Sequence, residues 1–125
     1  MTRRLLVSAV AAMLCLAPAG SVQAVQKSLS RLQMEFGVKV AMKGSWNEAA
    51  FRFEKAILAD GANARAYNNL AVARESLGQF GPAREAYEKA LELAPKDSKI
   101  RQNYDRFLSF YRSILPSQRN AGNAP

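Results

Sequence analysis

The sequence has 125 residues, no histidine, one cysteine and a formal net charge of +8. This length suffices for one domain. The absence of histidine disfavours acid–base catalysis near neutral pH and most transition-metal sites, because histidine is the usual residue for both. We therefore expect a protein that is not an enzyme and needs no cofactor or metal.

The first 24 residues have the layout of a secretory signal peptide. The pair Arg3-Arg4 forms a short positive start, an apolar run covers residues 5–16, and small residues precede a cleavage position after Ala24. A bilayer span needs roughly 20 apolar residues, so this run is short for a permanent anchor. The pattern predicts export to the periplasm of a bacterium or secretion.

Cleavage after Ala24 has two further consequences. It removes Cys15, so the mature chain can form no internal disulfide and no cysteine metal site. It also removes two arginines, which lowers the net charge from +8 to +6. The alternative is an uncleaved N-terminal anchor, and only in that case do we expect contact with a membrane.

An internal repeat follows a short lead-in at residues 25–29. A shift of 34 residues aligns 30–63 with 64–97. The identical pairs are Arg31/Arg65, Val38/Val72, Gly44/Gly78, Ala49/Ala83, Glu54/Glu88, Lys55/Lys89 and Ala56/Ala90. Small residues recur where helices must approach closely, and large apolar residues recur where space must be filled.

These positions resemble the tetratricopeptide repeat family over nearly the whole mature chain. The second repeat matches the family signature at Tyr67, Leu70, Ala71, Gly78, Phe80, Ala83, Tyr87, Ala90 and Pro95. The first repeat matches it at Phe36, Gly37, Gly44, Trp46, Ala49, Phe53 and Ala56. The resemblance implies an all-α fold, a right-handed α-solenoid of two helix hairpins with a C-terminal capping helix.

Local signals agree with that fold. Gly44 ends the first helix of repeat one, and Ser45 with Glu48 three residues later forms a capping box for the next helix. Pro95 stops the second helix of repeat two.

The C-terminal segment predicts one more helix, over residues 98–115. Its apolar face comprises Ile100, Tyr104, Phe107, Leu108, Tyr111 and Leu115. Such a helix would cap the array, because the last repeat otherwise exposes its apolar side. Residues 116–125 lack an apolar period, and we predict a disordered tail there.

In the family, the first helices of successive repeats line a groove that holds an extended peptide or a partner helix. The resemblance places these residues in that groove, with Glu35 and Val38 beside them: Arg31, Met34, Arg65, Asn68, Asn69, Val72, Lys99, Gln102, Asn103 and Arg106. Asparagine amides can bond to a peptide backbone, and arginines can grip a carboxylate with two bonds. A simpler interpretation is that Asn68 and Asn69 are polar residues tolerated on an exposed helix face.

One subfamily clamps the C-terminal carboxylate of its ligand with five residues. Asn69 and Lys99 match two of those positions, but Met34, Val38 and Asn103 stand at the other three and lack the required groups. The residues thus favour a generic groove over that clamp.

The leading hypothesis is a non-enzymatic adaptor that binds a protein or peptide in an extracytoplasmic assembly, with possible self-association. The alternative is a structural envelope-associated protein whose basic C-terminal end binds acidic envelope or membrane surfaces. Residues 96–125 carry six bases and two acids, which supports attraction to an acidic surface. We expect no nucleic-acid partner, because an exported protein would seldom meet one.

Overall fold

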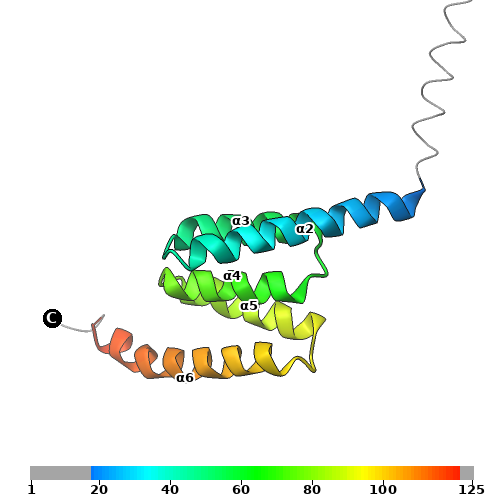
Figure 1. Cartoon of the computed structure of the whole chain (residues 1–125). Helices are drawn as coiled ribbons and strands as arrows, with labels where there is room; N and C mark the ends of the chain where they lie inside the picture. Colours follow the sequence, from blue (N-terminus) through cyan, green and yellow to red (C-terminus); the bar gives the residue numbers. More distant parts are fainter. Residues whose placement is uncertain (1–17, 122–125) are drawn as a thin grey trace, which may run out of the picture.

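The computed structural model describes residues 18–121 and consists, over that range, of five α-helices (Figure 1). They are α2 (Ala19–Ala41), α3 (Trp46–Ala59), α4 (Ala64–Ser76), α5 (Phe80–Leu93) and α6 (Ser98–Ala121). Helices α2 and α3 form one hairpin, α4 and α5 form a second, and α3 packs on α4 where the hairpins meet. Helix α6 lies against α5 and also contacts α4. The predicted all-α architecture is confirmed.

The same turn closes both hairpins. Gly44 and Gly78 are 34 positions apart in the sequence and have φ angles of 78° and 73°. The Ser45 backbone N–H donates to the Val40 carbonyl at 3.0 Å, and the equivalent bond of the second hairpin is 2.9 Å long. A left-handed residue after a helix is nearly free of strain only for glycine, which explains why the repeat keeps glycine at this position.

The helix starts differ from the predicted capping box. Ser45 makes no side-chain hydrogen bond to the start of α3. Glu48 instead accepts from Arg52 Nε at 2.7 Å, because a charge-assisted bond one turn along the helix competes with the cap. Asn63 does cap α4, where its Oδ1 accepts from the Ala66 backbone N–H at 3.1 Å.

The core combines small side chains with a few large rings. Ala49 and Ala83, which are equivalent in the two repeats, are both fully buried. Phe53, Tyr87 and Phe107 fill the larger spaces with at most 2% of their surface exposed. The small residues let the helices approach, and the rings fill the space between them, as the repeat pattern requires.

Helix α2 starts earlier than the predicted repeat. It begins after Pro18, so residues 19–24 of the predicted signal peptide and the lead-in at 25–29 are its first turns. The apolar run at 5–16 lies outside the described residues. Residues 20–29 are exposed and Ser30 is the first buried residue, so this part of α2 projects beyond the hairpin (Figure 1). Within residues 18–121, no helix is long and apolar enough to cross a bilayer.

Helix α6 ends later than predicted. It continues through Pro116 to Ala121, whereas the sequence indicated a helix over 98–115 and a disordered tail from 116. A proline inside a helix removes one N–H donor and can bend the chain, but the remaining hydrogen bonds can carry the helix past it. Residues 122–125 lie outside the described range.

Candidate binding groove

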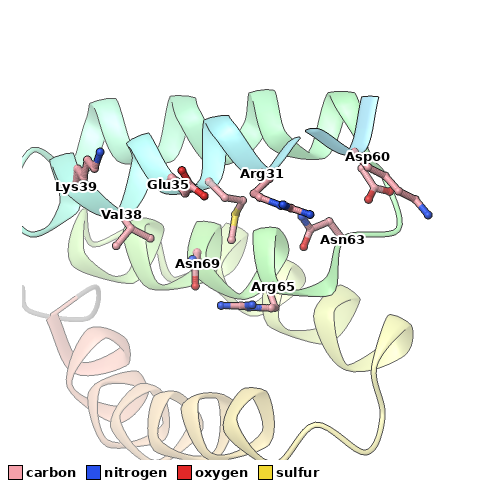
Figure 2. A pocket seen from close by; sticks show the side chains of 10 residues that line it. Arg31, Glu35, Val38, Lys39, Asp60, Asn63, Arg65 and Asn69 are labelled. Atoms are coloured by element: carbon pink, nitrogen blue, oxygen red, sulfur yellow. The ribbon is translucent and has the colours of Figure 1, made fainter. Parts of the chain in front are cut away.

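An open hollow lies between α2 and α4. It is open to solvent and has a volume of about 720 Å³. Figure 2 shows its side chains reaching in from α2, from α4 and from the loop that joins α3 to α4. The residues that line it are Lys27, Arg31, Met34, Glu35, Val38, Lys39, Asp60, Asn63, Arg65 and Asn69.

A second hollow, of about 260 Å³, continues the first one toward α6. Val38 and Asn69 line both hollows, so the two form one groove. The second hollow is lined by Val38, Ala41, Met42, Trp46, Phe53, Asn68, Asn69, Val72, Lys99 and Asn103. We call the combined hollow the groove.

Most residues predicted for the groove lie in it. Those in the first hollow are Arg31, Met34, Arg65 and Asn69, and those in the second are Asn68, Asn69, Val72, Lys99 and Asn103. Gln102 and Arg106 are exposed and line neither hollow. Arg106 shares a face of α6 with Lys99 but lies seven residues, or about two turns, further along the helix.

Asn68 holds two helices together. It is only 7% exposed, and its Oδ1 accepts from Asn103 Nδ2 at 3.0 Å, which ties α4 to α6. Its own Nδ2 donates to Asn69 Oδ1 at 3.2 Å. The interpretation of Asn68 as a tolerated polar residue on an exposed face is therefore wrong. Asn69 remains half-buried in the wall of both hollows, and no described side chain accepts from its amide.

The groove carries an excess of positive charge. Its bases are Lys27, Arg31, Lys39, Arg65 and Lys99, and its acids are Glu35 and Asp60. Five bases and two acids leave a net charge of +3 along the walls. An open site of this kind attracts segments with carboxylates. Within the described residues, no group of histidine, cysteine, aspartate and glutamate side chains could hold a metal ion.

Several residues of the groove were not predicted. Lys27 stands one turn before Arg31, and Lys39 stands one turn after Glu35, so extending the same face of α2 in both directions would have found them. Asn63 comes from the loop before α4, where it also donates from Nδ2 to the Oγ of buried Ser30 at 3.0 Å. Such a loop contribution has no periodic signal in the sequence.

The floor of the second hollow is apolar. Phe53 and Trp46 of α3 and Val72 of α4 contribute to it. Trp46 packs against the core while remaining half-buried at the edge of the hollow. The groove therefore offers apolar contact at one end and basic side chains at the other.

The five positions of the carboxylate clamp all lie in the groove. Met34, Val38 and Asn69 line the first hollow, and Lys99 and Asn103 line the second. Met34 and Val38 supply no hydrogen-bonding group, and the amide of Asn103 is engaged with Asn68. The positions are present, but the chemistry of a five-residue clamp is not.

Comparison with protein families identifies one repeat directly. The family described as tetratricopeptide repeat matches residues 64–97, which is the second predicted repeat. No curated protein matches the chain in sequence.

Solved structures share the fold. The tetratricopeptide domain of Arabidopsis OM64 has a TM-score of 0.64 and 27% identity, over 77% of this chain and 82% of that domain. The second such domain of human RPAP3, solved by NMR in complex with the HSP70 peptide SGPTIEEVD, has a TM-score of 0.60 and 23% identity. That match covers 62% of this chain and 65% of the human domain, slightly less than two thirds of its length. The UNC-45 chaperone, which folds muscle myosin, has a TM-score of 0.56 and 24% identity, over 88% of this chain and 12% of the chaperone.

Together these findings establish the architecture. The chain contains a tetratricopeptide repeat, and its five helices pack as tetratricopeptide-like hairpins. Tetratricopeptide repeats are non-catalytic scaffolds, which agrees with the non-enzymatic character predicted from the composition.

Proposed function

We propose that the chain is an adaptor that binds an acidic, extended segment of a partner protein in the groove. The observation that carries this proposal is the continuous hollow beside α2 and α4, whose walls have five bases against two acids. Arg31 and Arg65 stand on opposite walls, one on α2 and one on α4 (Figure 2). A ligand carboxylate between them can receive charge-assisted bonds from either side.

The rest of the groove suits a peptide backbone. Asn69 lies where the two hollows meet, and its amide can donate to a peptide carbonyl. Beyond it, Trp46 and Val72 provide apolar surface for one side chain of the ligand. The ligand is thus an acidic stretch with an apolar residue toward its α6 end.

The relatives support a peptide as the class of ligand. The human RPAP3 domain was solved with the peptide SGPTIEEVD, which contains acidic residues next to an apolar one. This chain lacks most of a carboxylate clamp, so we infer that it binds acidic side chains within a segment and not the free C-terminus. Two repeats give a short groove, and ordering costs leave only a modest net affinity, which we place in the micromolar range.

A peptide array tests the proposal. Peptides of graded net charge are probed with the full-length chain and with an Arg31→Ala/Arg65→Ala variant. We expect retention to follow negative charge and to fall at least about tenfold in the variant, which corresponds to roughly 1.4 kcal/mol. The matched control is Arg112→Ala, which removes an exposed base of α6 that does not line the groove.

Three outcomes of the array are informative. Equal retention of basic and acidic peptides, or full retention by the double variant, would show that the groove does not bind acidic segments. Sensitivity to Arg112→Ala alone, with binding to anionic lipid vesicles, would favour the alternative envelope-associated function. Amidation of the peptide C-terminus should change little, because recognition does not depend on the terminal carboxylate.

We further propose that the protein acts outside the cytoplasm, in the periplasm of a bacterium or as a secreted protein. The support is the pattern of residues 1–24 together with the exposure of residues 20–29, because cleavage after Ala24 would remove no buried residue of the described chain. The mass of the exported product should correspond to a chain that begins at Val25. A product that retains residues 1–24 would contradict cleavage.

A further inference from the structure

A stripe of apolar side chains runs along the outer side of α2. Its members are Val25, Leu29, Leu32 and Phe36, with 67%, 46%, 61% and 44% of their surface exposed. The spacing alternates between three and four residues, which is the repeat of a coiled-coil seam. None of these residues lines the groove. We call this set the α2 stripe.

The neighbouring helix extends the apolar surface. Phe51 and Leu58 of α3 are 46% and 80% exposed. The Arg52 guanidinium lies 4.4 Å from the centroid of the Phe36 ring and 5.6 Å from that of Phe51, so the two rings share one cation. Exposed apolar side chains thus lie on both helices of the first hairpin, with the Arg52 guanidinium between Phe36 and Phe51.

Part of the α2 stripe has no helix beside it within the described chain. Residues 20–29 are all exposed, and α2 continues past the end of α3 at this point (Figure 1). An isolated helical segment of this length is marginal in water, because helix stability in proteins comes mainly from packing of an apolar face. The projecting turns of α2 thus need a partner surface.

We propose that a second copy of the chain covers the α2 stripe, with the two α2 helices antiparallel about a two-fold axis between Leu29 and Leu32. In this register Leu29 of each copy meets Leu32 of the other, and Val25 meets Phe36. Every layer then pairs apolar with apolar, and the bulky ring of Phe36 meets a small side chain. The projecting turns of each α2 lie along the outer face of the other copy's first hairpin.

The charges beside the α2 stripe favour a second copy over a charged partner. On α2 the flanking positions are Gln26, Ser28, Gln33 and Glu35, which carry a single charge among them, and Arg52 of α3 adds one base beside Phe36. In the antiparallel register Gln26 faces Gln33, and Glu35 faces Ser28, so no like charges meet. Bases dominate the groove, by contrast, so an acidic partner is drawn there and not to the stripe.

The size of the face sets the strength of the contact. A stable interface takes roughly 20 to 30 residues from each partner. Helices α2 and α3 have 23 and 14 residues, and about half of these, roughly 18, lie on one side of the hairpin. We therefore expect a dimer that dissociates on dilution. The groove stays open in this dimer, because the stripe and the groove occupy different faces of α2.

Sedimentation of the full-length chain over a range of concentrations tests the proposal. We expect a monomer–dimer equilibrium that Leu29→Glu/Leu32→Glu weakens at least about a hundredfold, with an unchanged helical circular dichroism spectrum. Met42→Glu is the matched control, since Met42 is 84% exposed and lies outside the stripe. A monomer at all concentrations, or association that survives the double substitution, would overturn the proposal.

Disulfide cross-linking tests the orientation separately. In a Cys15→Ser background, the single variants Leu29→Cys and Leu32→Cys are oxidised alone and as a mixture. The antiparallel register predicts that the mixture cross-links faster than either variant alone. Faster cross-linking of each variant with itself would indicate parallel helices and contradict the proposed axis.

Discussion

Tyr87 joins the two helices of the second hairpin through its hydroxyl. The ring is fully buried, and the hydroxyl donates to Glu75 Oε2 at 2.9 Å. The rings of Tyr104 and Phe107 pack against it, with centroids 5.7 and 5.3 Å away. Burial, and then the hydrogen bond to Glu75, raise the pKa of Tyr87 well above its ordinary value, because both disfavour the phenolate.

This shift makes stability depend on pH in the alkaline range. In the unfolded chain Tyr87 ionises near pH 10, whereas in the folded chain it stays protonated to higher pH. The stabilisation is therefore complete below pH 10 and is lost progressively as the pH rises above it. We predict that Tyr87→Phe lowers the free energy of unfolding by about 1 kcal/mol at neutral pH and flattens its decline above pH 10.

Denaturant unfolding between pH 8 and pH 11 measures this effect. A part of the decline should remain in the variant, because burial also raises the pKa of Tyr104. Tyr67→Phe is the control, since Tyr67 is a half-buried tyrosine of α4 outside this cluster of rings. An equally steep decline in Tyr87→Phe and in the unmodified chain would contradict the assignment.

Residue roles in the groove were predictable only in part. The repeat placed Asn68 and Asn69 on the first helix of repeat two, but it could not distinguish them, because adjacent residues on a helix differ by about 100° in direction. The structure buries Asn68 against Asn103 and leaves Asn69 in the groove wall. Which of the two faces a neighbouring helix depends on the stacking, and no local pattern in the sequence encodes it.

At the scale of elements, α2 and α3 are in tight contact at Gly37. A Cβ added there would lie 2.5 Å from Cε1 of Phe53, a ring that is only 2% exposed. The ring is rigid and enclosed, so it cannot move aside cheaply. This contact explains why the first repeat carries glycine where the second carries Ala71.

We predict that Gly37→Ala destabilises the fold. Overpacking lowers the free energy of unfolding by about 1–3 kcal/mol, whereas the better helix propensity of alanine raises it by at most about 1 kcal/mol. The steric effect should therefore be the larger of the two. A net loss near 1 kcal/mol would lower the melting temperature by about 4–8 °C. Gly81→Ala is the matched control, because no atom lies within 4 Å of its added Cβ. An equal or higher melting temperature for Gly37→Ala would contradict the close approach.

Some helix ends could be predicted from single residues, and others could not. The glycine turns and Pro95 were predictable, because φ above zero and a missing N–H are properties of single residues. The capping box was not, since Glu48 can bond either to the backbone or to Arg52, and the choice depends on the folded geometry. The extension of α6 past Pro116 was missed because residues 116–125 lack the apolar period from which the helix was predicted.

At the scale of the whole molecule, two faces of α2 are specialised differently. The face toward α4 carries Lys27, Arg31 and Lys39 and lines the groove. The opposite face carries the apolar α2 stripe, which includes Leu29 and Leu32. The 34-residue repeat predicted the stack and most of the groove, whereas the stripe was not recognised, because its residues were assigned to the lead-in and to the first repeat.

Peptide binding in the groove is the central claim, and amide chemical-shift mapping tests it most directly. An acidic peptide selected on the array is titrated into the ¹⁵N-labelled chain. We predict that the shifted amides cluster on α2 around Arg31, on α4 around Asn69 and on α6 near Lys99, with one common dissociation constant. Shifts confined to the outer face of α3 or to the distal half of α6, with the groove amides unmoved, would contradict it.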